Sequence, residues 1–338
     1  FDYAGDVADD LPVWRASRNA IVTGHLATSY RRIEKTTPVI EVYADPADVW
    51  LHYLKALRPQ QWIKNLLVFL PLVAAHRLFE PAPLMKVVLA FAAVTACASS
   101  VYLLNDLLDL SSDRHHPHKR KRMLASGAIG TGGACWLMGT LLVSAIAIGF
   151  ALSPLFLLVL LSYYLMTLAY SLGLKDRVVL DVLILAGGYA ARVAAGAVAI
   201  GIAPSSWMLA FCVFLFFSLA LIKRFSELVL RRRLDGPKAQ ARAYVIDDAG
   251  VIAAQGIASG YLAVLVLALY TTTDLIQSLY GRYWLFWGIC VLLLYWISYL
   301  WLAADRGRIE DDPVSFAIKD RVSRNLLLGI AAIGLAAT

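Results

Sequence analysis

Asn105-Asp106-Leu107-Leu108-Asp109-Leu110-Ser111-Ser112-Asp113 decides the fold, because an amide and three carboxylates directly follow the long apolar run 84–105. If the helix continues past this run, Asp106, Asp109 and Asp113 occupy positions i, i+3 and i+7 and lie on one face. Three unpaired carboxylates at a membrane boundary repel one another at a cost of several kcal/mol, and a divalent cation removes that cost. Mg²⁺ prefers carboxylate oxygens and also binds substrate phosphates, so the stretch predicts a magnesium-bound diphosphate. The alternative is a solvated helix end paired with the basic residues that follow.

The composition places this helix in a membrane. The 338 residues are 60% hydrophobic and 16% charged, with a mean hydropathy of +0.66. Ordinary soluble domains carry roughly 25% charged residues. Four cysteines lie in apolar runs without a C-x-x-C spacing, which indicates neither a disulfide framework nor a metal site. We therefore expect an all-α integral membrane protein.

Apolar runs of about 20 residues mark the candidate spans. The working count is nine, with eight as the alternative because Lys64 opens the first run and Pro71 interrupts it. The expected spans are residues 62–79, 84–105, 134–152, 154–173, 178–202, 206–223, 251–272, 283–303 and 323–338.

Charge in the loops predicts the orientation. The loops after even-numbered expected spans hold nineteen Lys and Arg residues. The loops on the other side of the membrane hold only Arg77, Lys86 and Arg282. By the positive-inside rule, these basic loops and the N-terminus are cytoplasmic. The nineteen are Arg114, Lys119, Arg120, Lys121, Arg122, Lys175, Arg177, Lys223, Arg224, Arg231, Arg232, Arg233, Lys238, Arg242, Arg306, Arg308, Lys319, Arg321 and Arg324.

Three further groups of residues are candidates for binding phosphate or metal. His115-His116-Pro117-His118-Lys119-Arg120-Lys121-Arg122 follows the acidic stretch, and Arg and Lys there suit phosphate contacts. Tyr170, Lys175 and Asp181 surround the start of the fifth span, where Asp181 could hold a second metal or pair with a neighbouring cation. The remaining candidates are Arg192, which is a functional hypothesis because it lies inside a membrane helix, and the pair Lys223 and Arg224 before Glu227.

These motifs, in this order, resemble the UbiA superfamily of intramembrane prenyltransferases. The resemblance rests on residues 105–113, on Arg122-Met123-Leu124-Ala125-Ser126-Gly127, and on Tyr170-Ser171 with Lys175 and Asp181. It covers about residues 50–338 and implies nine helices around a central cavity, with two Asp-rich sites that bind Mg²⁺ and a diphosphate. Within the superfamily the chain is most similar to the decaprenyl-phosphate phosphoribosyltransferase branch. Three stretches carry this similarity: Arg58-Pro59-Gln60-Gln61-Trp62-Ile63-Lys64-Asn65, then Asp181 with Arg192, then Lys223-Arg224 with Glu227.

The resemblance also implies roles for single residues. Asp106, Asp109, Asp113 and Asp181 would hold magnesium and be catalytic. The expected substrate-binding residues are Asn105, Lys64, Lys119, Lys121, Arg122, Tyr170, Lys175, Arg192, Lys223 and Arg224. The expected substrates are phosphoribosyl diphosphate and a polyprenyl phosphate.

The N-terminal stretch from Phe1 to Trp14 resembles the last motif of a HAD-type phosphatase, in which Asp6 and Asp10 match magnesium-binding carboxylates. The nucleophilic Asp motif that begins such a domain is missing. We therefore expect residues 1–45 to be the C-terminal remnant of a HAD-like domain with a linker, and residues 46–338 to be the transferase domain.

Two other functions stay open at this stage. A polyprenyltransferase would move a prenyl group from a prenyl diphosphate to an aromatic or other small acceptor through the same site. A transporter would also carry intramembrane charges, although an inverted repeat is not apparent and the charge lies at one membrane face. Nucleic acid is not an expected partner, because a basic face and binding motifs are missing, and a homo-oligomer is possible.

Overall fold

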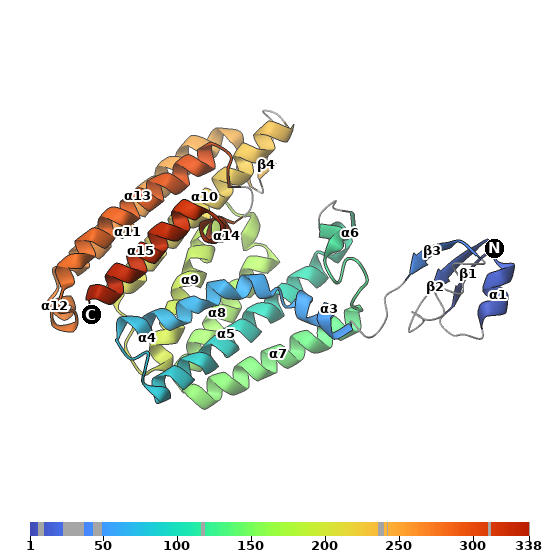
Figure 1. Cartoon of the computed structure of the whole chain (residues 1–338), viewed down its shortest axis with the longest axis horizontal. Coiled ribbons are helices and arrows are strands. Elements are labelled where there is room, and N and C mark those ends of the chain that lie inside the picture. The colour runs from blue at the N-terminus through green and yellow to red at the C-terminus, as the bar shows by residue number, and fades with distance from the viewer. Residues whose placement is uncertain are drawn as a thin grey trace. The chain divides into compact units, whose positions relative to one another are not determined.

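The computed structural model describes residues 1–5, 10–22, 37–42, 49–115, 119–235, 240–241, 243–309 and 312–337. Figure 1 shows its helices and strands, coloured from the N-terminus to the C-terminus. The chain divides into two compact units. The first comprises residues 1–62 and 99–142, and the second comprises residues 63–98 and 143–338. The boundaries between the two units fall inside continuous helices.

The first unit begins with a three-stranded parallel sheet. Its strands are β1 (Asp2–Gly5), β2 (Asn19–Val22) and β3 (Val39–Val42), in the order β1-β2-β3. Helix α1 (Leu11–Ala16) connects β1 to β2 and carries the fully buried Trp14, whose indole donates to the Tyr3 carbonyl at 3.2 Å. Asp10 accepts a hydrogen bond from the Tyr3 hydroxyl at 2.9 Å. Asp6 and the predicted domain boundary at residues 45/46 lie outside the described residues, so the HAD-type remnant stays a prediction.

Short helices complete the first unit around the helix ends that carry the acidic stretch. Ala56, Leu103, Leu124, Ile129 and Ala134 form its small apolar core. The elements are α3 (Val49–Ala56), the start of the 3₁₀ helix η3 (Pro59–Phe69), the end of α5 (Pro81–Leu108), α6 (Leu110–His115), η4 (Lys119–Lys121) and the first half of α7 (Thr131–Leu152).

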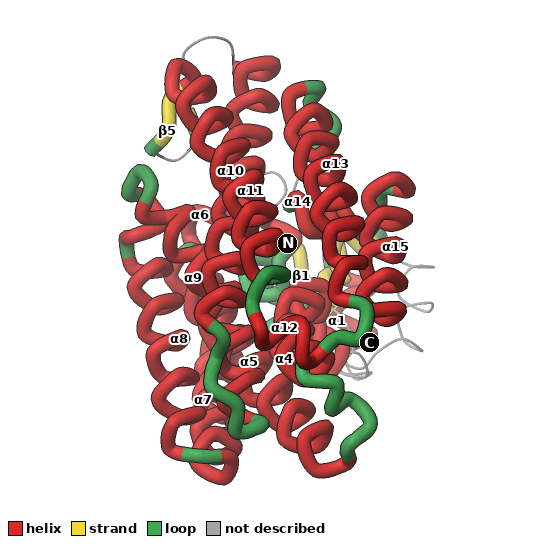
Figure 2. Tube along the Cα trace, turned by 90° about the vertical axis from the view of Figure 1, so that its left-hand side faces the viewer, coloured by secondary structure: helices red, strands yellow, loops and turns green. Residues whose placement is uncertain are grey.

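The second unit is a bundle of long apolar helices, coloured red in Figure 2. Besides the remainders of η3, α5 and α7, it contains α4 (Leu70–Ala74), α8 (Pro154–Leu172), η5 (Leu174–Asp176), α9 (Leu180–Ala199), α10 (Ser206–Asp235), β4 (Gln240–Ala241), β5 (Tyr244–Val245), η7 (Ile246–Asp248), α11 (Ala249–Tyr270), α12 (Asp274–Leu279), η8 (Tyr283–Leu285), α13 (Phe286–Asp305), α14 (Pro313–Lys319) and α15 (Arg321–Ala337).

Seven helices in the described part of the chain are long and apolar enough to cross a membrane. Their ranges are Pro81–Leu108, Thr131–Leu152, Pro154–Leu172, Leu180–Ala199, Ser206–Arg233, Ile246–Tyr270 and Tyr283–Asp305, and each overlaps one expected span. The chain is therefore a multi-pass membrane protein. The expected ninth span is α15, whose 17 residues lie at the lower limit for crossing a bilayer, so that span stays a prediction.

The first expected span, residues 62–79, is wrong as a single helix. The structure divides it into η3 and the short helix α4, with a turn at His76, whose φ is 58°. The polar residues in this run have partners in the second unit: Asn65 binds Arg192, and Lys64 pairs with Asp312 at 2.6 Å. These contacts tie the segment to the helices of the second unit. Its 11 residues of 3₁₀ helix are an unusually long run, because such helices are mostly short.

Small residues allow the second unit's helices to pack closely. Gly256 and Gly260 of α11 form a G-x-x-x-G pattern, and a Cβ at these positions would meet Trp301 at 2.1 Å and Ile297 at 2.6 Å. Small residues at this spacing let membrane helices approach one another. Figure 2 shows α10, α11 and α13 running beside one another, and Trp301 donates to Ser218 of α10 at 3.2 Å.

The tightest backbone approach is at Gly196 of α9, where a Cβ would lie 1.9 Å from the Val68 carbonyl oxygen. We predict that Gly196→Ala lowers stability by about 1–3 kcal/mol, because the backbone of η3 must move to admit one methyl group. The measurement is thermal unfolding in detergent. Gly139→Ala is the control, since no atom lies within 4 Å of its added Cβ. Equal melting temperatures for the two variants would contradict the close packing.

Candidate active site

Two carboxylates of the acidic stretch come together at the end of α5. Asp106 and Asp113 are 5% and 1% exposed. Seven residues advance an α-helix by nearly two full turns, so these two side chains share a face. The turn at Asp109 separates α5 from α6, yet the Asp113 amide still donates to the Asp109 carbonyl at 2.8 Å, which preserves the helical register.

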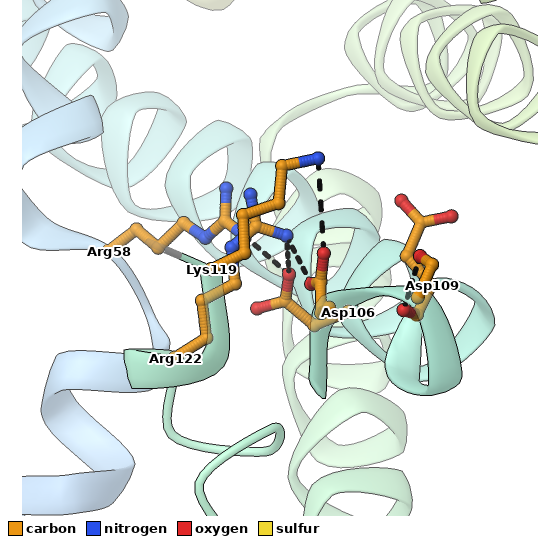
Figure 3. A network of polar contacts seen from close by, with 7 residues as sticks. Arg58, Asp106, Asp109, Lys119 and Arg122 are labelled. Carbon is orange, nitrogen blue, oxygen red and sulfur yellow. Dashed lines mark hydrogen bonds and ion pairs between the residues drawn. The ribbon is translucent and has the colours of Figure 1, made fainter. Parts of the chain in front are cut away.

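Arg122 bridges the two carboxylates. Its Nη1 lies 3.1 Å from Asp106 Oδ1 and 2.5 Å from Asp113 Oδ2. Arg58 contacts the same Asp106 oxygen, and Lys119 Nζ lies 3.9 Å from Asp113 Oδ1 (Figure 3). Buried carboxylates are stable only when cations or hydrogen-bond donors offset their desolvation, and the three basic side chains supply that charge.

Asp109 does not join this pair. Figure 3 shows its carboxylate turned away from Asp106 and Arg122. The expectation of three carboxylates on one face is wrong for Asp109: position i+3 lies about 60° from position i around a helix, so its side chain points to another side than that of Asp106.

Arg58 reaches the pair from an unusual backbone conformation. Its φ is 54°, in the left-handed region that costs a non-glycine residue roughly 1–2 kcal/mol. The conformation ends α3 just before Pro59, with the Arg58 amide donating to the Lys55 carbonyl at 3.1 Å. Arg58 belongs to the motif of residues 58–65, but it is not among the site residues predicted from the sequence. Its position before a proline at a helix end is the signal that could have found it.

The acidic pair fits a magnesium ion that also binds a diphosphate. Within the described ranges, no three His, Cys, Asp or Glu side chains gather as a metal-binding group. Magnesium, however, is usually bound through one or two carboxylates, together with water and substrate phosphates. Asp113 Oδ1 is buried and accepts no hydrogen bond from any described residue, so it retains an open ligand position.

A second cluster lies in the second unit around Asp181, at the start of α9. Arg224 Nε donates to Asp181 Oδ2 at 2.6 Å, and the Tyr244 hydroxyl donates to Oδ1 at 2.7 Å. Arg224 also binds Glu227 at 2.6 Å and the Tyr170 hydroxyl at 3.3 Å. Both Asp181 oxygens are thus satisfied by protein groups, and Asp181 and Arg224 are fully buried.

Tyr244 connects this cluster to the backbone. Its hydroxyl accepts from the Val179 amide at 2.9 Å, and Val179 has a φ of 67°, which is an outlier for a β-branched residue. Burial, and next the hydrogen bond to Asp181, raise the pKa of Tyr244, so the hydroxyl keeps its proton and continues to donate. Sequence reasoning missed Tyr244, because nothing in the polar segment around it indicates a contact with residue 181.

Other predicted site residues of the second unit bind partners outside the hydrogen-bond network around Asp181. Buried Arg192 donates to Asn65 Oδ1 at 2.8 Å and to the Tyr163 hydroxyl at 2.7 Å, and Asn65 donates to Thr95 at 3.0 Å. Lys64 pairs with Asp312. Lys175 is half-buried in η5, and Lys223 is half-buried beside Arg224. In the first unit, Asn105 is half-buried and Lys121 is exposed.

The comparison with protein families decides the assignment. The model of the UbiA prenyltransferase family matches residues 66–319, which is most of the chain. The chain belongs to the UbiA prenyltransferase family. It is accordingly a transferase of the membrane.

Three relatives of known sequence show how this UbiA-family chain compares with other proteins. An uncharacterized protein of Sinorhizobium fredii, y4nM, is 31% identical over 96% of this chain, which spans only 63% of that protein's length. Nodulation protein NoeC of Azorhizobium caulinodans is 33% identical, over 83% of this chain and 92% of that protein. Decaprenyl-phosphate phosphoribosyltransferase of Mycolicibacterium smegmatis is 34% identical, over 84% of this chain and 91% of that protein.

A solved structure supports the fold of this UbiA-family chain. A UbiA homologue from Archaeoglobus fulgidus, bound to GPP and Mg²⁺, superposes with a TM-score of 0.63 at 19% identity. The match covers 85% of this chain and 99% of that one.

The Asp181 cluster makes a specific stability prediction. Arg224→Met leaves Asp181 buried without its cation, so we expect a loss of about 3–5 kcal/mol. Combining it with Asp181→Asn removes the uncompensated charge, and we expect part of the loss to be recovered. Thermal unfolding of the two single variants and the double variant in detergent measures the coupling. A double variant no more stable than Arg224→Met would contradict the pairing.

Proposed function

We propose that this protein is a magnesium-dependent transferase that moves the phosphoribosyl group of phosphoribosyl diphosphate onto a polyprenyl phosphate. The observation that carries the proposal is the buried pair Asp106 and Asp113 with Arg122 between them. Such a pair suits Mg²⁺ shared with a diphosphate leaving group. The similarity to decaprenyl-phosphate phosphoribosyltransferases, at 34% identity for one of them, supports the choice of donor and acceptor.

The proposed roles follow from the chemistry of each group. Bound magnesium would neutralise the diphosphate as it leaves, with Asp106 and Asp113 as its protein ligands. Arg58, Arg122 and Lys119 would turn from the carboxylates to the phosphate oxygens, since guanidinium groups bind phosphate bidentately and Lys supplies a point charge. The acceptor phosphate is already an anion, so the reaction requires no general base, and the protein contributes position and charge. Two further acids, Asp109 and Asp181, remain candidates for contacts with metal. Two further lysines, Lys121 and Lys175, remain candidates for contacts with phosphate.

A second candidate function is prenyl transfer from a polyprenyl diphosphate to an aromatic or other small acceptor. It is favoured by the fold shared with the Archaeoglobus fulgidus homologue, whose structure holds GPP and Mg²⁺. In both proposals the basic residues that follow the even-numbered expected spans are cytoplasmic, as is the N-terminus, so the diphosphate site would lie at the cytoplasmic face.

The donor can be tested directly. We expect purified protein in nanodiscs to move label from phosphoribosyl diphosphate into the lipid phase when a polyprenyl phosphate and Mg²⁺ are present. EDTA should stop the transfer, because the leaving diphosphate is then not neutralised. Failure to label the lipid, together with prenylation of an aromatic acceptor from a polyprenyl diphosphate, would replace this function with the second candidate.

The metal ligands can be tested apart from turnover. We expect Asp106→Asn and Asp113→Asn each to reduce transfer at least roughly 100-fold, as loss of a preorganised charge contact does in other enzymes. Both should also weaken Mn²⁺ binding measured by electron paramagnetic resonance in the presence of inorganic diphosphate. Asp247→Asn is the control, because Asp247 is an exposed acid at the start of the α11 span. Unchanged Mn²⁺ binding in both site variants would refute the metal assignment.

A further inference from the structure

A cavity of about 310 Å³ lies in the first unit beside Asp106. Four short stretches line it: the end of α3 with Arg58, the start of η3, the end of α5 at Asp106, and the pair Arg122 and Met123. Among the described residues that line the cavity, Asp106 is the only carboxylate. The lining residues are Lys55, Ala56, Arg58, Gln60, Gln61, Asp106, Arg122 and Met123.

Most of the side chains that line the cavity are polar, with Ala56 and Met123 as the apolar exceptions. Lys55, Arg58 and Arg122 bring three positive charges against the one carboxylate, and Gln60 and Gln61 bring two amides. Burying such groups against a hydrocarbon chain would remove their water without replacing its hydrogen bonds, at a cost of roughly 1–3 kcal/mol for each unsatisfied group. A ligand with hydroxyl groups and negative charge would satisfy them. The lining therefore disfavours an isoprenoid chain as the occupant.

The size of the cavity points the same way. Small-molecule sites are usually about 300–1,000 Å³, and this cavity lies at the lower end of that range. That space suits a single sugar ring with a phosphate. It adjoins Asp106, so a sugar held there would have its diphosphate beside the acidic pair.

The local backbone holds the two glutamines in place. Arg58 adopts its left-handed conformation, and its carbonyl accepts a hydrogen bond from the Gln61 amide at 2.8 Å. Its side chain is tied to Asp106. The backbone at the first turn of η3 is thus anchored beside Asp106, where Gln60 and Gln61 line the cavity.

We infer that this cavity is the sugar subsite of the donor, with Gln60 and Gln61 as specificity residues for sugar hydroxyls and Lys55 as the partner of a phosphate carried by that sugar. The inference rests on the proposed function and names residues that select a phosphorylated sugar over an isoprenoid chain. A primary amide both donates and accepts hydrogen bonds, as a hydroxyl does, so each glutamine can bind one or two hydroxyls of the ring.

The test is donor binding without turnover. The full chain in nanodiscs, with Mg²⁺ and no acceptor lipid, is titrated by calorimetry with phosphoribosyl diphosphate and separately with inorganic diphosphate. The double variant Gln60→Leu/Gln61→Leu should raise the Kd for phosphoribosyl diphosphate about tenfold or more, which corresponds to about 1.4 kcal/mol. Its Kd for inorganic diphosphate should stay within about twofold, because that ligand lacks the sugar. Lys55→Met should show the same selective loss.

Gln277→Leu is the matched control, since Gln277 is an exposed glutamine of α12 outside the cavity, and it should change neither Kd. Equal Kd values for phosphoribosyl diphosphate in the wild type and the double variant would overturn the inference. An equal loss for both ligands would also overturn it, because the glutamines would then act on the diphosphate alone. Wild-type protein that binds geranyl diphosphate and inorganic diphosphate but not phosphoribosyl diphosphate would instead overturn the proposed function.

Discussion

The ion pairs that Arg122 makes with Asp106 and Asp113 are the constraint on which the first unit depends. Two carboxylates that are almost fully buried at a helix end must be neutralised, and Arg122 does this from a loop that follows α6. The contact holds that loop against α5, and Arg58 and Lys119 contact the same two carboxylates. The loop, the end of α3 and the acidic pair are thereby fixed as one polar centre.

The two buried acidic clusters differ in how completely their oxygens are satisfied. Asp181 has a donor on each oxygen, and its partner Arg224 is also fully buried. In this arrangement protein groups supply a hydrogen bond to each oxygen at the start of α9. Asp113 keeps one buried oxygen with no hydrogen bond from the described residues, and Arg122 is partly exposed. Because an open coordination position and a movable cation are what a metal–diphosphate complex requires, the pair of the first unit is the better candidate for chemistry.

Much of the fold could be predicted from apolar runs, because each of the seven long helices contains a long hydrophobic segment. The prediction failed at residues 62–79, where the run is divided into the 3₁₀ helix η3 and the short helix α4. Asn65 and Lys64 of this run bind partners far away in the sequence, which a local pattern does not show. At the site, the spacing of Asp106 and Asp113 predicted their common face, and the basic run supplied Arg122. The turn at Asp109 and the contact of Tyr244 with Asp181 could not be predicted, because both depend on tertiary packing rather than on local pattern.

The central claim is that the acidic pair exchanges its arginine for a magnesium-bound diphosphate. A cryo-electron microscopy structure of the protein in nanodiscs with Mg²⁺ and phosphoribosyl diphosphate tests it most directly. The account predicts Asp106 and Asp113 as magnesium ligands, with the Arg122 guanidinium moved onto a phosphate oxygen. A donor complex bound while Arg122 still bridges the two carboxylates, with the metal held elsewhere, would contradict it.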